Sequence, residues 1–576
     1  MTECSVGTSV RWSEAALAKA VIALMVILFV AYLVAFVQSM RPWWFHPAWT
    51  TDDALQQIYP FHRILDAELF KDDLITTMMT AYLAPIHYWI CALVTRLTGD
   101  PIMMGHWVML LQLSLTVGFV FLAVKRAVGW APALFAAVWM LHSRRIVQRM
   151  TGGLPRGWAA PLFAAFFYFV LSGNHVAVLL LLAVGCLLHP PATLAMAIAY
   201  GLFLMVLVFS ADRAAEGRRW LSRYVLLSPL YIVLVLSVVQ MPAEIGTMAD
   251  YATASQMPEF QSPTGRFPFL PFPPLWDDLR LYGFHAFTDR FSSPVPYLVV
   301  ALLAALAVAS IYLKRELVPV QAWCFLVGAM VVYALSRELA FRLYVPNRHL
   351  QFPLAFFMIV GFTIAAWRIG ACARTKYRPL FQLACLCLLA AIIGWGSGLG
   401  LKGPANFNYT RDQRGRVIQW IAKYTPKDAL IAGEPTFIDP VQLFAKRTAY
   451  VTSETAHPFY DTYYAEMKRR LEITLRAHYA PDLRTLLEIV EPEGIDYFVF
   501  EKKRFYPRVL ATATYFPPFD GLVRTLTSRD AEQYAYKQLP KSIDLANAPY
   551  MPYRDDRAAV VEIAALRRFL DHGFAP

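Results

Sequence analysis

Residues 43–53 read WWFHPAWTTDD and follow the first long apolar run of the chain, residues 15–38. That run is too long for the core of a signal peptide, which is roughly 7–15 residues, and no small-residue cleavage site follows it. We therefore expect a permanent membrane helix that leads into an acidic, aromatic loop. Charges at a membrane face are costly unless they have a function or meet water. The adjacent Asp52 and Asp53 accordingly mark this loop as a candidate site.

The composition extends the membrane pattern to most of the 576-residue chain. Hydrophobic residues make up 57% of the sequence and charged residues only 16%, against about 25% charged in a soluble domain. The mean hydropathy is +0.43. The composition and the recurring apolar runs predict a polytopic α-helical membrane protein. The net charge of +12 comes mostly from short loops between these runs, which favours a role in membrane topology over nucleic-acid binding.

About 11 transmembrane helices are predicted, at residues 15–38, 102–124, 127–142, 156–173, 175–189, 191–210, 221–241, 294–312, 318–337, 350–368 and 379–401. The segment 80–97 contains Pro85, His87 and Arg96, and it is ambiguous between a span and a surface helix. If it does not cross, most basic short loops fall in the cytoplasm, as the positive-inside rule requires. Residues 39–101 and 242–293 then form external loops. The basic stretch 142–156 is the exception, because it also falls outside.

After residue 402 the composition becomes that of a soluble domain. Helices are expected at 415–424, 463–480 and 482–490, and strands at 428–432 and 495–501. This alternation predicts a small α/β domain over residues 403–576. Because the number of spans is odd, the domain is expected outside the cytoplasm.

The first external loop carries two carboxylate pairs, Asp52-Asp53 and Asp72-Asp73. A carboxylate at the membrane rim can act as a general base toward an acceptor hydroxyl or amine, or it can hold a divalent cation. The alternative is structural, because Thr51-Asp52-Asp53 suits a helix start and Asp72-Asp73 suits a charged loop before a surface helix. Both readings can hold, since a capping carboxylate can also be catalytic.

Basic and ionisable residues on the same face are candidates for substrate binding: Arg156, His189, Arg342, Arg348 and His349. Guanidinium groups suit phosphate capture, whereas pairing with lipid headgroups or a nearby acid is the alternative role. His189 precedes two prolines, which interrupt a helix and free backbone carbonyls; as a lone histidine it can equally be a packing residue. No glycine-rich phosphate loop and no metal-spaced His/Cys cluster occurs in the sequence. No cofactor is therefore assigned, and a divalent cation stays open.

The order of these features resembles the GT-C superfamily of polytopic glycosyltransferases, which includes oligosaccharyltransferases and protein O-mannosyltransferases. Residues 85–89 (PIHYW) followed by residues 97–100 (LTGD) are similar to a stretch that these enzymes have after the first external loop. Five further motifs look like those of a family of bacterial GT-C-like membrane proteins without assigned function: LFKDDLI (69–75), LPRGWAAPL (154–162), LLHPPATL (187–194), VPNRHLQF (345–352) and WIAKYTPKDALI (420–431).

The resemblance implies an inverting transfer of a sugar from a polyprenyl-phosphate donor to an extracytoplasmic glycan, lipid or protein, in a bacterial inner membrane. It implies that Asp52 or Asp53 is the general base. Arg342 or Arg348, with Arg156, would then hold the lipid phosphate. The C-terminal domain contains no WWD-like acceptor motif, which speaks against oligosaccharyltransferase activity. Two alternatives stay open: a lipid or polysaccharide transporter, although no paired halves are visible, and a non-catalytic scaffold for envelope assembly.

Overall fold

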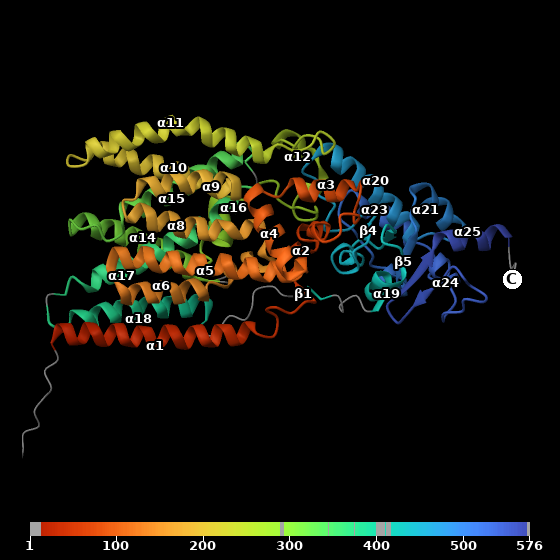
Figure 1. Cartoon of the computed structure of the whole chain (residues 1–576), viewed down its shortest axis with the longest axis horizontal. Helices are drawn as coiled ribbons and strands as arrows, with labels where there is room; N and C mark the ends of the chain where they lie inside the picture. Colours follow the sequence, from red (N-terminus) through yellow and green to blue (C-terminus); the bar gives the residue numbers. More distant parts are fainter. Residues whose placement is uncertain are drawn as a thin grey trace, which may run out of the picture.

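The computed structural model describes residues 13–288, 293–343, 345–373, 375–398, 409–410 and 416–572. Long helices run side by side along the long axis of the molecule, and an α/β domain packs against one end of this bundle (Figure 1). The predicted fold class, a polytopic helical membrane protein with a C-terminal α/β domain, is confirmed. The predicted domain boundary at residue 403 lies outside the described residues.

Each of the predicted apolar segments forms a helix: α1 (Glu14–Met40), α5 (Pro101–Val128), α6 (Trp130–His142), α8 (Ala159–Leu171), α9 (His175–Leu188), α10 (Pro190–Val208), α11 (Ala214–Val239), α14 (Val295–Tyr312), α15 (Val320–Glu338), α17 (Pro353–Gly370) and α18 (Arg378–Ser397). Eight helices in the described ranges are long and apolar enough to cross a membrane. The shorter α6, α8 and α9 have 13, 13 and 14 residues. The count of 11 spans is therefore not confirmed.

The centre of the bundle is α17, together with the short α16 (Arg348–Gln351) before it. A helix that is apolar on all sides is typical of a fully enclosed position. The span Arg348–Gly370, which includes α16 and α17, is 94% buried. By contrast, only 6% of the α11 span is buried, and α11 forms an outer wall of the bundle (Figure 1). Small residues allow close helix crossings: Gly328 of α15 lies directly against Ala199 of α10.

The predicted first external loop, residues 39–101, contains β1 (Trp49–Thr50), α2 (Asp52–Gln57), η1 (Tyr59–Ile64), α3 (Leu74–Ala81) and α4 (Pro85–Thr98). The ambiguous segment 80–97 is not one straight helix, because α3 and α4 meet at 112°. Pro85 begins α4 and the left-handed Gly99 (φ 69°) ends it. Trp89, Leu93 and Leu97 form an exposed apolar stripe on α4, opposite buried residues that include His87. This two-faced helix suits a position with lipid on one side.

The basic stretch 142–156 forms α7 (Arg144–Met150), η2 (Thr151–Gly153) and the start of η3 (Pro155–Trp158). The Nε2 atom of His142 lies 3.1 Å from the hydroxyl of Ser397, at the end of α18. Because α18 leads into the α/β domain, this loop lies at the domain's end of the bundle.

The predicted second external loop, residues 242–293, forms α12 (Tyr251–Gln256), η4 (Pro258–Phe260), α13 (Leu275–Asp278) and the π-helical turn η5 (Leu279–Gly283). Residues 289–292 of the predicted loop lie outside the described residues. The loop packs on α20 (Asp461–His478) of the C-terminal domain, where the Tyr464 hydroxyl donates to Glu259 at 2.9 Å. The backbone nitrogen of Thr247 donates to Asp461 at 2.8 Å.

The C-terminal domain contains a five-stranded sheet in the order β4-β3-β5-β7-β6. The strands are β3 (Leu430–Gly433), β4 (Thr448–Ala449), β5 (Tyr497–Glu501), β6 (Tyr553–Arg554) and β7 (Ala558–Glu562). β4, β3 and β5 are parallel, with Ile431 opposite Tyr497, whereas β7 and β6 are antiparallel to their neighbours. A separate two-residue strand, β2 (Tyr409–Thr410), pairs with β1. This pairing ties the chain leading into the domain to the first external loop.

The remaining elements of this domain surround the sheet. They are α19 (Arg416–Tyr424), η7 (Val441–Ala445), α21 (Leu483–Val490), η8 (Glu491–Glu493), η9 (Lys502–Phe505), α22 (Pro507–Leu510), α23 (Phe519–Leu526), α24 (Ala535–Gln538) and α25 (Ile563–His572).

A buried histidine in this domain predicts a dependence of stability on pH. His478 is fully buried among the rings of Tyr479, Phe500 and Phe505, and neither ring nitrogen has a hydrogen-bond partner among the described residues. Burial lowers the pKa of His478 to about 3. An unfolded histidine binds a proton below about pH 6.5. The free energy of unfolding should therefore fall by about 2 kcal/mol between pH 7 and pH 5 because of this one group.

The variant His478→Phe tests this expectation. It removes the titrating group and fits the aromatic surroundings, so the decline in Tm from pH 7 to pH 5 should be smaller than in the wild type. Thermal unfolding of the full chain in detergent at both pH values measures the difference. Equal declines in the two proteins would contradict a neutral, buried His478.

Candidate functional site

A cavity of about 900 Å³ lies where the helical bundle meets the C-terminal domain. One end is polar, with five arginines against three carboxylates, so the net charge of this end is positive. These residues are Asp52, Asp53, Arg149, Arg156, Arg266, Arg342, Arg348 and Glu454. They come from α2, the stretch 142–156, the second loop (242–293), the turn between α15 and α17, and the C-terminal domain, and are therefore brought together only by the complete fold.

The other end of the cavity is an apolar arm. It runs between α9, α10 and the outer helix α11, and its lining includes Leu182, Ile198, Ile232, Val235 and Leu236. Ile232 and Leu236 also have exposed side-chain surface, 58% each. The outer wall of the arm is therefore a single helix whose other face is open to its surroundings.

The N-terminal turn of α2 carries the two carboxylates of the first loop. The Thr51 hydroxyl donates to Asp52 Oδ1 at 2.8 Å, and the backbone nitrogen of Asp53 donates to the same oxygen at 3.0 Å. Acidic residues in this turn are favoured by the helix dipole. The predicted helix start is observed, and both carboxylates nevertheless line the cavity.

Asp53 forms an ion pair with Arg156, with 2.6 Å between its Oδ2 and the Nη2 of the arginine. Burial alone would raise the pKa of Asp53, but Arg156, Arg149 and Arg348 hold that pKa below its usual range. Asp53 is therefore ionised at neutral pH and binds its proton weakly.

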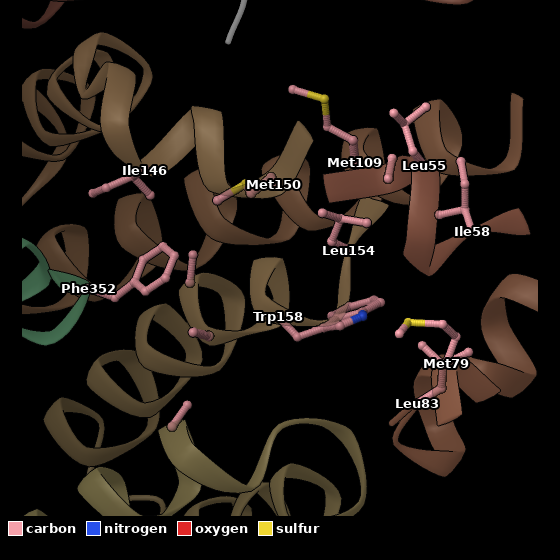
Figure 2. Packing of buried hydrophobic residues seen from close by; sticks show 14 of the residues in the cluster. Leu55, Ile58, Met79, Leu83, Met109, Ile146, Met150, Leu154, Trp158 and Phe352 are labelled. Carbon is pink, nitrogen blue, oxygen red and sulfur yellow. The ribbon is translucent and has the colours of Figure 1, made fainter. Parts of the chain in front are cut away.

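Apolar packing fixes the loop that carries Arg149 and Arg156. Leu154 belongs to the same buried cluster as Met109 and Leu55, and the ring of Trp158 extends toward Met79 (Figure 2). The indole nitrogen of Trp158 donates to His87 Nδ1 at 3.0 Å. The two arginines therefore project from a rigid support rather than from a solvated loop.

The other predicted basic residues also line the cavity: His189, Arg342, Arg348 and His349. Arg348 donates to Gln351 Oε1 at 3.3 Å, and the Nε2–H of His349 donates to the Leu343 carbonyl at 2.7 Å. In the described part of the chain, the buried Nε atoms of Arg156, Arg266 and Arg348 have no hydrogen-bond partner. Buried donors are normally satisfied, so these three groups suit an anionic ligand.

The second carboxylate pair lies elsewhere. Asp73 is the N-cap of α3, where it accepts from the backbone nitrogen of Thr76 at 2.9 Å and from its hydroxyl at 2.6 Å. Asp72 is exposed, with a left-handed backbone (φ 51°). Neither residue lines the cavity. Their contacts match the structural alternative, and we do not assign Asp72 or Asp73 to the site.

Several cavity residues were not expected from the sequence: Gln56, Arg149, Arg266, Glu454 and His457. Arg149 had a signal, because it belongs to the one basic stretch that contradicts the positive-inside rule. Glu454 and His457 had none, because they are about 400 residues from α2 and look like ordinary loop residues of a soluble domain.

A divalent cation, which the sequence leaves open, would need several carboxylate, carbonyl or similar donors close together. The described residues contain no group of three or more His, Cys, Asp or Glu side chains arranged to hold a metal ion. Asp53 is engaged by Arg156. We therefore assign no step to a cation.

Comparison with solved structures finds chains of similar fold at low sequence identity. The oligosaccharyltransferase of Archaeoglobus fulgidus in its apo form is 10% identical, with a TM-score of 0.48 over 89% of this chain and 72% of its own. ArnT of Cupriavidus metallidurans in the apo state is 15% identical, with a TM-score of 0.47 over 94% of this chain and 98% of its own. The same protein bound to undecaprenyl phosphate gives a TM-score of 0.46, at 15% identity and with the same coverage.

A further structure of the Archaeoglobus fulgidus enzyme is a complex with Zn and sulfate. No protein-family model matches the chain, and no curated protein matches it. The cavity is therefore the feature of this chain from which its function can be inferred.

Proposed function

We propose that the protein transfers a sugar from a polyprenyl-phosphate donor to an acceptor at the membrane face. The observation that carries this proposal is the two-part cavity. Its polar end, which we call the head, contains five arginines and joins an apolar arm beside α11. A long isoprenoid phosphate has the same two parts. Because the outer wall of the arm is one sparsely buried helix, the lipid tail can occupy the arm while the phosphate reaches the arginines.

The arginines would hold the phosphate in the ground state and stabilise the charge that it gains as it leaves the sugar. Arg156 and Arg348 have buried Nε donors without a partner in the described ranges, and Arg149 and Arg342 lie in the same head. Guanidinium groups suit phosphate oxygens geometrically. The leaving phosphate needs no proton, because its monoester is a stable anion.

The sugar would lie beside the bound phosphate, next to the carboxylates of α2. Asp52 and Asp53 then face the reacting carbon and the acceptor, which is a hydroxyl or amine of a glycan, lipid or protein. A single displacement at that carbon inverts its configuration. We further propose a bacterial inner membrane location with the C-terminal domain outside the cytoplasm.

Undecaprenyl phosphate binding tests the donor assignment without knowledge of the sugar. The purified full chain in nanodiscs should bind undecaprenyl phosphate at least about 10-fold more tightly than undecaprenol, because charge-assisted hydrogen bonds contribute about 1.5–3 kcal/mol each. Arg149→Gln and Arg348→Gln should each remove about 10-fold of that preference.

Arg144→Gln is the matched control, since Arg144 is exposed on the same short helix as Arg149 and does not line the cavity. Its affinity for undecaprenyl phosphate should equal that of the wild type. Equal affinities of the wild type for the phosphate and the alcohol would contradict a phosphate-binding head.

A further inference from the structure

The C-terminal domain contributes a third carboxylate to the cavity. Glu454 follows β4 at the carboxyl edge of the three parallel strands, and the chain passes from β4 on one side of β3 to β5 on the other. Ligands of such sheets bind outside the carboxyl ends of the strands, where the strand order reverses. Here that edge faces the membrane domain, since Arg266 of the second external loop donates to the Ser453 carbonyl at 2.8 Å.

The contacts of Glu454 fix its carboxylate toward the first loop. Gln56 of α2 donates from its Nε2 to Glu454 Oε2 at 3.2 Å, and Arg266 lies 3.5 Å from Oε1. The Oε1 of the same Gln56 accepts from His457 Nε2 at 2.5 Å. The backbone nitrogen of Glu454 donates to Asp439 at 3.0 Å. The side chain stays 24% exposed, so it is oriented but still accessible from the cavity.

Two of the three carboxylates of the cavity, Asp53 and Glu454, have opposite electrostatic surroundings. Arg156, Arg149 and Arg348 outweigh burial at Asp53 and lower its pKa. At Glu454, burial raises the pKa, and the nearby Asp53 and Asp52 add to this effect against the opposing Arg266. A general base works best when its pKa is close to the working pH, and pairs of carboxylates with divergent pKa values commonly divide the chemical roles.

We propose that Glu454 is the general base that takes the proton of the acceptor hydroxyl, while Asp53 orients the phosphate-binding arginines and faces the positive charge that develops on the sugar. This inference rests on the proposed function. In the step, the acceptor oxygen bonds to the anomeric carbon, and its proton moves to the Glu454 carboxylate. The bond from that carbon to the phosphate oxygen breaks, and its electron pair stays on the phosphate. Glu454 then releases the proton to water.

The role of Glu454 as general base can be measured with the full chain in nanodiscs. The assay follows the transfer of sugar from tritiated undecaprenyl-phosphate-linked hexoses to a total envelope extract. Glu454→Gln keeps the shape and the hydrogen bond from Gln56, so Tm should not change, and undecaprenyl phosphate affinity should not fall. Its kcat should fall about 100-fold or more, the usual size of general-base catalysis. The wild-type rate should rise with pH as the base ionises, and the variant should lose that rise. Glu454→Asp should recover part of the rate.

Glu493→Gln is the matched control, because Glu493 is also a partly buried glutamate of this domain that an arginine holds, Arg469 at 2.6 Å, and it lies outside the cavity. Its rate and pH profile should match the wild type. A wild-type profile in Glu454→Gln would overturn the base assignment, and the proposed function would stand if Arg348→Gln still lost undecaprenyl phosphate binding. A parallel loss of Tm, lipid binding and transfer, with no recovery in Glu454→Asp, would show that Glu454 only stabilises the contact between the two domains. That result would also overturn the base assignment.

Discussion

Asp53→Asn should lower transfer from undecaprenyl-phosphate-linked hexoses by about 100- to 1,000-fold while the affinity for undecaprenyl phosphate rises. The substitution removes a negative charge that lies 2.6 Å from Arg156 and close enough to Arg149 and Arg348 to share their field. The head then becomes more positive, which favours the bound phosphate. The sugar carbon loses the carboxylate that faces it, and the loss of one preorganised charged group at a reacting centre typically costs 10²–10³ in rate.

Opposite changes in binding and turnover distinguish this role from a simple loss of structure. Binding is measured with undecaprenyl phosphate in nanodiscs, and turnover is measured as the release of that lipid from its hexose conjugates. Asp72→Asn is the control, because Asp72 is an exposed carboxylate of the same loop that does not line the cavity. Unchanged turnover in Asp53→Asn would remove Asp53 from the reacting centre.

Gly105→Ala should disable the site from a distance. Gly105 of α5 packs against the loop that follows Arg149, and a Cβ at this position would lie 2.6 Å from the Gly152 carbonyl oxygen. Gly152 has a left-handed backbone (φ 81°) and itself lies against Thr51 and Ala54 of α2. The clash should cost about 1–3 kcal/mol or more and should shift both arginine-bearing turns away from α2. We therefore expect a lower Tm and at least about 10-fold weaker binding of undecaprenyl phosphate.

The same helix supplies the control for that variant. A Cβ on Gly118 of α5 would meet no atom within 4 Å, so Gly118→Ala should leave binding unchanged and should not lower Tm, because alanine is the better helix former. Equal behaviour of the two variants would show that the contact between α5 and the loop does not position the arginines.

The helices of the bundle were predictable because each is a long apolar run, and membrane helices must satisfy their backbone hydrogen bonds internally. The positions of α19, α20, α21, β3 and β5 were also close to those expected, since their periodic patterns are strong. The hairpin of β6 and β7 was missed, because its strands are short and the sequence between residues 549 and 557 is rich in proline and charge. The crossing of 80–97 could not be decided, because a 112° bend is set by tertiary packing.

The candidate site was predictable only in part, because several of its residues are brought together by tertiary packing alone. Asp53, Arg156 and Arg348 stand out because charge is rare near apolar runs. Glu454 and Gln56 do not stand out, because glutamate and glutamine are common in soluble segments, and only the docked domain brings the two side chains together. Asp73 has the same chemistry as Asp53 but caps α3 outside the cavity, and a buried N-cap and a catalytic carboxylate look alike in a sequence.

The pairing of Gln56 with Glu454 joins residues 398 positions apart, and this separation has a consequence for the newly made chain. At about 5–20 residues per second, the ribosome needs about 20 to 80 s after α2 to reach Glu454. Throughout that interval the first loop is already at the membrane surface while its partner has not been synthesised. A half-made chain can thus meet lipid phosphates with its arginines, but it lacks the group that we propose takes up the acceptor's proton. Under this proposal, a chain that ends before Glu454 should be inactive in transfer even though it carries the arginines of α7 and η3.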